Sequence, residues 1–299
     1  MTDDNQPSQS SLSAKLQLTQ LTESYRFDQE LADLLTAFTY QDDGIALTAH
    51  SDHQLPTAAI DPPTAGIDAA FSPAASLVFV CYDDRGHQMV NPVEATLTDA
   101  ITQTVATTPT SMPADIDPPV GLAEDHHVTS ADCTSQTAAV GDAAGPSLSL
   151  GVVTPHNAQR GLCTDRLPSS ITANTVEKFQ GGERDIIAVS ATVADPEFAR
   201  AEEQFILNPR RLLVAISRSR FLTIVICSTA LFAVAPKNSE HLAHGPVWGR
   251  LFTEAVGRDP DPAWTGPLAE FVGDDDIAHD TVPVRVYPSS INDSGGERQ

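Results

Sequence analysis

The chain has 299 residues, of which 41% are apolar, so it is long enough to bury one large hydrophobic core or two small ones. Asp and Glu outnumber Lys and Arg by 40 to 17, and the formal net charge of -23 argues against a general polyanion-binding protein. The sequence has no signal peptide and no apolar run near the roughly 18 residues that a membrane span needs, so we expect a cytoplasmic protein without membrane contact.

The acidity is spread unevenly along the chain. Residues 157–220 contain 9 basic and 8 acidic side chains, so the remainder carries about -24. A strongly acidic, Lys-poor chain repels itself at low salt, which predicts a halophilic protein from a cytoplasm of very high ionic strength. The alternative is an acidic protein that avoids nucleic acids. At about 1 M salt the Debye length is about 3 Å, so distant carboxylates would hardly oppose a local cationic site.

The first third of the chain contains a few clear elements. We expect residues 1–15 to be a disordered start and residues 16–258 to form one domain. Leu and Phe side chains recur with helical spacing from Gln29 to Tyr40, which predicts an amphipathic helix. A loop rich in Pro, Asp and Gly is predicted for residues 41–73.

A strand, a helix and an insertion follow. Ser76–Tyr82 is an apolar run of strand length, and Asn91-Pro92 is a typical helix start that predicts a helix to about Val105. Residues 106–149 consist mainly of Thr, Pro, Ala, Asp and Ser, without Lys or Arg. This composition predicts a disordered, acidic, low-complexity insertion.

From residue 150 onward, apolar strands alternate with helices. The predicted strands are 150–154, 175–179, 185–192 and 222–227, and the predicted helices are 156–167, 208–220 and 246–256. This alternation predicts right-handed βαβ crossovers, and therefore an α/β fold with a parallel sheet that helices cover on both faces. Residues 259–299 are rich in Asp and Pro and are predicted to be a loose acidic tail.

Residues that follow the predicted strands are the first site candidates, because ligands of such sheets collect at the carboxyl ends of the strands. Thr154, Pro155 and His156 follow one strand, where they either begin a helix or contact a nucleic acid. The segment from Gln180 to Glu183 follows the next strand, and its two glycines allow a ligand to approach the backbone closely. The same segment also suits a tight turn between two strands.

A predicted helix that begins with Asn208 as N-cap and Pro209 at its first position carries several arginines. Arg211 and Arg218 are expected on the side opposite its apolar face. The planar guanidinium group matches phosphate oxygens, which indicates a phosphate ligand, and plain salt bridges are the alternative. The sequence predicts no metal site, because its four cysteines are widely spaced and lack the pairing of zinc ligands.

Four segments of the chain are, in order, SYRF, GVVTPHNAQ, NTVEKFQGGERDIIAVSAT and NPRRLLVAISRSR. They closely resemble the second RecA-like domain of superfamily 1B helicases, in the branch of the nonsense-decay RNA helicase and the DNA-replication helicase-nuclease. The resemblance runs from about Leu18 to Cys227 with the insertion looped out. It implies a single RecA-like domain of the P-loop NTPase fold, with ATP and Mg²⁺ as cofactors and single-stranded DNA or RNA as partner.

The resemblance also implies roles for individual residues. Arg26 and Arg218 match two arginines that stabilise the transferring γ-phosphoryl group of ATP, which makes them the predicted catalytic residues. The remaining nucleotide-binding candidates are Gln180, Gly181, Gly182, Glu183 and Arg211. The candidates for contact with the single strand are Thr154, Pro155, His156 and Thr175.

The sequence departs from the family pattern in several places. Leu213 stands where the family usually has Asn, and His156 stands where it usually has Tyr. The sequence also lacks a GxxxxGK[ST] phosphate loop and an apolar strand that ends in a DE pair for Mg²⁺. We therefore expect this chain to hydrolyse essentially no ATP by itself.

Three hypotheses follow from this pattern. The first is the C-terminal half of an ATP-dependent DNA or RNA helicase, completed by an N-terminal half that acts in trans or was separated by a split or frameshifted gene. The second is a non-catalytic nucleic-acid-binding or regulatory module derived from such a helicase. The third is a decayed remnant without function.

Overall fold

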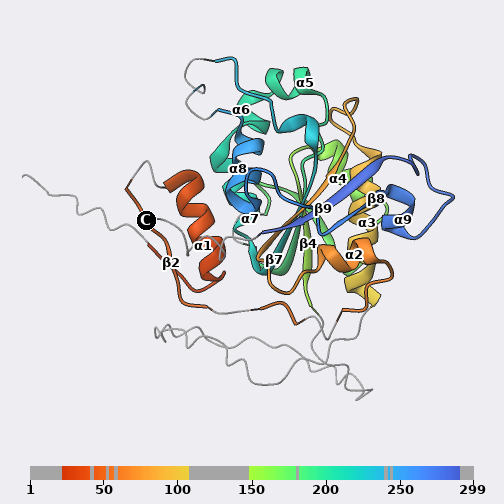
Figure 1. Cartoon of the computed structure of the whole chain (residues 1–299), viewed down its shortest axis with the longest axis horizontal. Helices are drawn as coiled ribbons and strands as arrows, with labels where there is room; N and C mark the ends of the chain where they lie inside the picture. Colours follow the sequence, from red (N-terminus) through yellow and green to blue (C-terminus); the bar gives the residue numbers. More distant parts are fainter. Residues whose placement is uncertain are drawn as a thin grey trace, which may run out of the picture.

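A seven-stranded, mostly parallel sheet forms the centre of the fold (Figure 1). The computed structural model describes residues 22–40, 44–51, 54–56, 60–107, 148–179, 182–238, 242 and 245–289. In spatial order the strands are β5 (Thr172–Thr175), β4 (Leu150–Thr154), β6 (Arg184–Ser190), β7 (Ser219–Ser228), β3 (Leu77–Tyr82), β9 (Pro283–Pro288) and β8 (Trp264–Pro267). The first five are parallel, and β9 pairs antiparallel with both β3 and β8. This confirms the α/β class and the mostly parallel sheet of a RecA-like domain.

Helices cover both faces of this sheet. They are α1 (Gln29–Leu35) with a π-helical turn η1 (Thr36–Tyr40), α2 (Ala65–Ala70), α3 (Pro92–Thr107), α4 (Asn157–Thr164), α5 (Pro196–Ala201), α6 (Glu203–Ile206), α7 (Pro209–Ile216), the 3₁₀ turn η4 (Thr229–Leu231), α8 (Val247–Val256) and α9 (Leu268–Val272). Among the described residues, no helix is both long and apolar enough to cross a bilayer.

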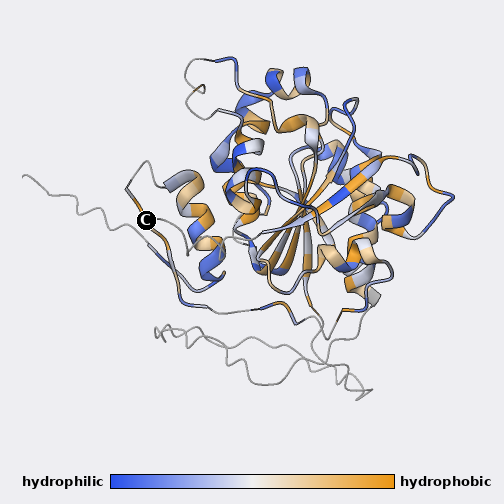
Figure 2. Ribbon diagram, viewed as in Figure 1, coloured by the Kyte–Doolittle hydropathy of each residue, from blue (hydrophilic) through white to orange (hydrophobic). Residues whose placement is uncertain are grey.

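The central strands are apolar on both sides, which is why the sheet is covered on both sides (Figure 2). Val78 and Val80 of β3 pack into one core with α2, α3 and α9. Phe79 and Cys81 alternate with them and pack into the other core with α1, α7 and α8. Each fully buried side chain of this kind stabilises the fold by about 1.5–3 kcal/mol, so both cores hold the strand ends in place.

Most of the predicted elements are confirmed with small shifts at their ends. The apolar runs form β3, β4, β6 and β7, and the predicted helices form α1 with η1, α3, α4 and α8. The predicted start 1–15 and nearly all of the predicted insertion 106–149 lie outside the described residues.

The prediction of a strand at 175–179 is wrong. β5 ends at Thr175, and the next four residues form a turn in which the Phe179 N–H donates to the Thr175 carbonyl at 3.0 Å. The Phe179 ring then packs over Gly151 of β4, where an added Cβ would lie only 2.5 Å from the ring. The chain therefore doubles back across β4 before it enters β6.

The predicted helix 208–220 is too long at its carboxyl end. α7 ends at Ile216, and β7 begins at Ser219. The Arg218 carbonyl accepts a hydrogen bond from the Arg184 N–H at 3.2 Å, so it already takes part in the contact between β6 and β7. Arg218 therefore lies in the turn before β7, and it does not share a helix face with Arg211.

The loop predicted for 41–73 and the loose tail predicted for 259–299 both contain regular structure. Within the loop lie α2 and a short strand β2 (Thr48–Ala49), which pairs with β1 (Glu23–Ser24). In the tail, β9 pairs with β3 and buries Val284 and Val286 in the core, so the expectation of a loose arm is wrong for 264–288. The division of the chain into domains stays a prediction.

Candidate functional site

The predicted site residues lie at two opposite edges of the sheet. Glu183 immediately precedes β6 and Arg218 immediately precedes β7, so both lie at the amino ends of these strands. Thr154 and Thr175 are the last residues of β4 and β5, at the carboxyl ends. The expectation that the Gly182–Glu183 segment lies at carboxyl ends is therefore wrong, because the chain has doubled back across β4.

Arg26, Glu183, Arg218 and Arg220, which we name the arginine cluster, come together at the amino edge. The Arg26 Nε donates to the Glu183 Oε1 at 2.7 Å, and its Nη2 lies 2.5 Å from the same oxygen. The Arg26 Nη1 donates to the carbonyl oxygen of Ser217 at 3.2 Å, so Arg26 is held against the turn that carries Arg218. The Nε of Arg220 lies 3.6 Å from the other Glu183 oxygen.

The electrostatics of the arginine cluster favour an anion. Partial burial and the nearby charge of Arg26 lower the pKa of Arg218, and the Glu183 charge opposes both. The Arg218 Nε is buried, and none of the described residues accepts a hydrogen bond from it. Partial burial acts to raise the pKa of Glu183, but the hydrogen bonds and charges of Arg26 and Arg220 bring it below its ordinary value. Arg26, Arg218 and Arg220 thus lie around the Glu183 carboxylate, and Asp185 adds a second carboxylate 3.9 Å from Arg220. Three cations against two carboxylates leave net positive charge beside the unused Nε of Arg218.

The segment that carries Arg26 is anchored by two carboxylates at the start of α1, of which Glu30 is buried and Asp28 partly exposed. Asp28 caps the helix by accepting a hydrogen bond from the Leu31 N–H at 3.0 Å. The Glu30 carboxylate is buried and accepts bonds from the N–H and hydroxyl of Ser76 at 3.0 and 2.8 Å and from the Ser289 hydroxyl at 2.6 Å. These bonds fix the start of α1 to the amino end of β3, and this fixes the position of Arg26.

The Gly-rich segment is described only in part. Gln180 and Gly181 lie outside the described residues, so their predicted contacts stay predictions. The Gly182 N–H donates to the Phe179 carbonyl at 3.0 Å, which closes a turn just before Glu183. The packing of Phe179 over Gly151 thus determines where Gly182 and Glu183 lie.

Arg211 lies apart from the arginine cluster. It forms an ion pair with Glu177, and its guanidinium carbon lies 3.7 Å from the centre of the Phe205 ring. His156 stacks on the same ring, with the ring centres 5.6 Å apart and the planes inclined by 25°. Arg211 therefore lies close to the candidates for strand contact, and its predicted role in nucleotide binding stays a prediction.

Thr154, Pro155, His156 and Thr175, which we name the threonine edge, lie close together. Thr154 and Thr175 are partners in the β4–β5 register. The Thr154 hydroxyl is buried and lies 3.0 Å from the Thr192 hydroxyl, so it is already engaged within the protein. A direct contact from Thr154 to a bound strand would therefore have to come from its main chain or follow a local rearrangement.

The aromatic part of the threonine edge is half-buried. His156 packs against Phe205 and lies 6.1 Å from the ring centre of Phe198, and burial lowers its pKa despite the charge of Glu202. Pro155 lines a small, mostly apolar cavity that Phe205, Arg211 and other side chains enclose. His156 and Phe205 thus form a stacked aromatic pair beside the ends of β4 and β5, which we name the aromatic wall.

Sequence reasoning missed Tyr25, which precedes Arg26. Its side chain is 71% exposed and stacks on His50, with the ring centres 4.8 Å apart. An exposed aromatic face beside the arginine cluster suits a flat ligand such as a nucleobase. Tyr25 belongs to the SYRF segment that carries the family resemblance, but only its exposure in the structure indicates a ligand contact.

The described residues contain no group of three or more His, Cys, Asp or Glu side chains arranged to hold a metal ion. Cys81, Cys163 and Cys227 are free and buried, and burial raises the pKa of Cys163 to about 12. Cys133 lies outside the described residues.

Comparisons with known proteins agree with the fold. Residues 126–230 match the AAA_12 family of AAA domains. The chain is 37% identical over 86 residues to the DNA polymerase alpha-associated DNA helicase A of Saccharomyces cerevisiae, 28% identical over 114 residues to the regulator of nonsense transcripts 1 of Dictyostelium discoideum, and 35% identical over 95 residues to the probable RNA helicase armi of Drosophila melanogaster. These matches cover 27%, 35% and 28% of this chain but only 12%, 8% and 8% of the three relatives.

Proposed function

Since the chain carries a domain of the superfamily 1 helicase family, we propose that it works as the second RecA-like domain of an ATP-dependent DNA or RNA helicase. In this role Arg26 and Arg218 act on the γ-phosphoryl group of ATP, and the threonine edge contacts a single strand. The observation that carries the proposal is the convergence of Arg26 and Arg218, from segments far apart in the sequence, around the single carboxylate of Glu183.

The arginine cluster suits the charge that develops during phosphoryl transfer. The negative charge of the transferring group spreads over its oxygens, and a guanidinium placed beside it lowers the barrier without doing covalent chemistry. Arg26 is held in place by Glu183 and Ser217, so little conformational entropy remains to be lost when it meets the nucleotide. Arg218 supplies a donor whose Nε has no acceptor among the described residues.

Other residues of the amino edge would hold the rest of the nucleotide. An ionised carboxylate has about four acceptor sites, so Glu183 can accept a hydrogen bond from a ribose hydroxyl while Arg26 stays bound to it. Tyr25 offers an exposed ring for a nucleobase. These roles agree with the charges and exposures of the cluster, and each is a separate, testable part of the proposal.

The phosphate cradle and the Mg²⁺ ligands are assigned to another domain. The 299 residues contain no GxxxxGK[ST] loop, and the described residues contain no cluster of three or more metal-ligating side chains. We therefore place these parts on a first RecA-like domain, either in the same polypeptide or in a partner. Mg²⁺ bound there would neutralise charge on the β- and γ-phosphate oxygens.

The threonine edge is the proposed place of strand contact. Main-chain groups at the ends of parallel strands suit a phosphate backbone, and the aromatic wall of His156 and Phe205 lies beside them. Arg211 supplies a cation at the same place. We propose that the high salt of a halophile's cytoplasm screens the acidic remainder of the chain, so that this local contact is effective.

The decisive experiment joins the chain to its first domain and measures strand-stimulated ATP hydrolysis at high salt. We expect activity in the joined protein, essentially none in this chain alone, and a loss of about 10³-fold on Arg26→Ala or Arg218→Ala. ATP hydrolysis by this chain alone that depends on Arg218 would contradict the assignment of the cradle to another domain. Full activity of both alanine variants would contradict the arginine roles.

The alternative of a non-catalytic nucleic-acid-binding module is favoured by one observation, the separation of Arg211 and the threonine edge from the arginine cluster. A module of this kind would bind a single strand with an affinity that Arg211→Ala lowers and Arg218→Ala leaves unchanged. If joining the first domain then restores no ATP hydrolysis, this alternative replaces the helicase proposal.

A further inference from the structure

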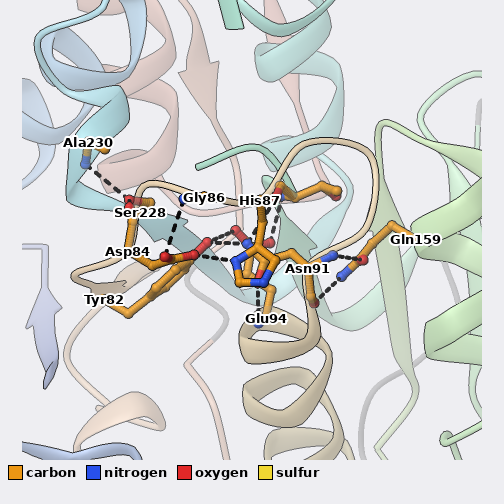
Figure 3. A network of polar contacts seen from close by, with 10 residues as sticks. Tyr82, Asp84, Gly86, His87, Asn91, Glu94, Gln159, Ser228 and Ala230 are labelled. Carbon is orange, nitrogen blue, oxygen red and sulfur yellow. Dashed lines mark hydrogen bonds and ion pairs between the residues drawn. The ribbon is translucent and has the colours of Figure 1, made fainter. Parts of the chain in front are cut away.

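A buried polar network lies at the carboxyl ends of β3 and β6 and reaches Thr154 of the threonine edge through Thr192. Figure 3 shows its part around Tyr82, Asn91, Glu94 and Gln159. The centre of the network is Glu94 of α3, whose carboxylate is fully buried. It accepts hydrogen bonds from the Tyr82 hydroxyl at 2.7 Å, the Ser190 hydroxyl at 2.5 Å and the Thr192 N–H at 2.6 Å. One side chain thus joins a helix to the ends of two strands.

The position of Glu94 in its helix shows that it does more than stabilise α3. Asn91 caps the helix by accepting a hydrogen bond from the Glu94 N–H at 3.2 Å, and in such a pair the Glu side chain usually reaches back to the N–H of the capping residue. Here the Asn91 N–H donates to the Oε1 of Gln159 in α4 at 2.8 Å and not to Glu94. Glu94 is therefore free to bond across to Thr192.

Thr192 is held in an unfavourable backbone conformation. Its φ angle is +68°, a region that β-branched residues rarely adopt. Both of its main-chain polar groups are bound by the network, because the N–H donates to Glu94 and the carbonyl accepts from the Asn91 Nδ2 at 2.9 Å. The Thr192 hydroxyl in turn lies 3.0 Å from that of Thr154. A continuous series of contacts therefore runs from α3 to the threonine edge.

We propose that Asn91 and Glu94 are positioning residues for strand binding, which act through Thr192 to hold Thr154 and the ends of β4 and β6. The inference rests on the proposed function, because it assigns the threonine edge to the strand. Glu94 does not touch the strand. Without its bond to the Thr192 N–H, the left-handed conformation loses one of its two main-chain supports, and the hydroxyl pair with Thr154 shifts.

This arrangement makes strand binding sensitive to pH. Burial raises the pKa of Glu94 to about 7, although the bonds from Ser190, Thr192 and Tyr82 oppose the rise. The other titratable groups that act on Glu94 are the Asp84 carboxyl, which pairs with His87, the Tyr82 hydroxyl, and the thiols of Cys163 and Cys227.

The ionised carboxylate is the stronger acceptor for the Thr192 N–H, so Thr192 is held most firmly above the Glu94 pKa. A protonated Glu94 must also donate its hydrogen. If it donates to the Tyr82 hydroxyl oxygen, this hydrogen competes with the Asn91 Nδ2, which already donates to that oxygen at 2.5 Å. Strand affinity should therefore rise as pH increases through about 7, and it should rise more than in a variant whose residue 94 cannot ionise.

The test compares the full chain with Glu94→Gln at high salt from about pH 5 to about pH 9. The probes are fluorescein-labelled oligothymidine and oligouridine strands, and fluorescence anisotropy gives the affinity. We expect the affinity of the unaltered chain to rise roughly fivefold more across this range than that of the Gln variant. The same pH dependence in both proteins would overturn the inference.

A matched pair at Thr192 tests the same connection without altering a charge. Thr192→Ser keeps the hydroxyl that faces Thr154, and Thr192→Val keeps the shape but removes it. We expect Val to lower strand affinity severalfold and Ser to preserve it, and equal affinities of the two variants would overturn the inference. This pair also decides the question if Glu94→Gln fails to fold. If the unaltered chain binds neither strand at any pH, the proposed strand contact itself is wrong and the inference falls with it.

Discussion

The arginine cluster and the threonine edge lie at opposite edges of one sheet and differ in how far their polar side chains are exposed to solvent. The arginine cluster keeps its charges partly exposed, with side-chain exposures of 30% for Arg26, 34% for Glu183 and 54% for Arg220. The threonine edge and the adjoining network of Glu94 instead bury Thr154, Thr192 and Glu94 in hydrogen bonds. Cations that must meet a polyphosphate have to remain accessible, whereas main-chain groups that must align with a strand need a rigid support.

Because of this difference, substitutions in the two regions should affect different properties of the protein. In the arginine cluster, removal of Arg26 or Arg218 should greatly slow ATP hydrolysis and hardly affect stability, because exposed ion pairs contribute little to folding. At the threonine edge, alteration of a buried group should affect stability and binding together, because an unsatisfied buried polar group is costly.

Arg218→Ala should give the largest functional effect. In the protein joined to its first domain, ATP hydrolysis should fall about 10³-fold because a cation that stabilises the transferring group is lost. The free energy of unfolding should hardly change, since the Arg218 Nε bonds to none of the described residues. Arg220→Ala is the matched control, because Arg220 is more exposed and only loosely paired with Glu183 at 3.6 Å. Equal rates for the two variants would remove the distinction between these arginines.

Glu94 should produce a pH dependence of stability at the threonine edge. Its folded pKa of about 7 lies above the ordinary value of 4.5, so the folded state binds this proton more tightly than the unfolded state. The stabilisation is fully present below about pH 4.5 and is lost as pH rises through about 7, with a total change of at most about 3 kcal/mol.

Guanidinium unfolding followed by tryptophan fluorescence measures this change. Glu94→Gln serves as the control, since it keeps the shape but cannot ionise. The difference between the two proteins in the pH slope isolates Glu94 from the general repulsion of a chain with net charge -23. Parallel slopes would show that Glu94 does not titrate in this range.

Gly151→Ala should disturb the route by which Glu183 reaches the arginine cluster. The added Cβ would lie 2.5 Å from the Phe179 ring and 3.0 Å from the Arg184 Cγ, so the ring must move. We expect a loss of about 1–3 kcal/mol in the free energy of unfolding and weaker ATP hydrolysis in the joined protein. Gly161→Ala is the control, because its Cβ would meet nothing within 4 Å and should stabilise α4 by up to about 1 kcal/mol. A neutral Gly151→Ala would show that the Phe179 ring does not constrain the turn.

The sequence was sufficient for the centre of the fold, whereas the roles of the site residues stay predictions. Long apolar runs are unambiguous signals, so β3 and β4 were predicted well. β9 was missed because its buried Val284 and Val286 alternate within a short segment flanked by Asp and Pro, where local composition indicates a loop. Its assignment to the sheet depends on pairing with β3, about 200 residues earlier, which no local pattern encodes.

The site shows the same limit. The ordered motifs identified Arg26, Glu183 and Arg218, but they did not indicate that Arg211 lies apart from the cluster. The separation follows from the end of α7 at Ile216, which the contact between Arg184 and the following turn imposes. The sequence around Glu94 does not indicate its role, because two of its hydrogen-bond donors, the Ser190 hydroxyl and the Thr192 N–H, lie 96 and 98 residues away in sequence.

Glu183→Gln should have the smallest effect on stability and the sharpest contrast with Glu94. Since both members of its pair with Arg26 are partly exposed, we expect a loss below about 1 kcal/mol. The pKa of Glu183 is lowered, so its stabilisation is present above the ordinary value of 4.5 and is lost as pH falls through the lower folded value. The two carboxylates therefore act in opposite pH ranges, and unfolding measured in acid and near neutral pH separates them. Arg26 keeps its bond to the Ser217 carbonyl in this variant, so ATP hydrolysis in the joined protein should fall far less than in Arg26→Ala. An equal fall would mean that Glu183 itself, and not only the arginine it holds, is indispensable at the nucleotide.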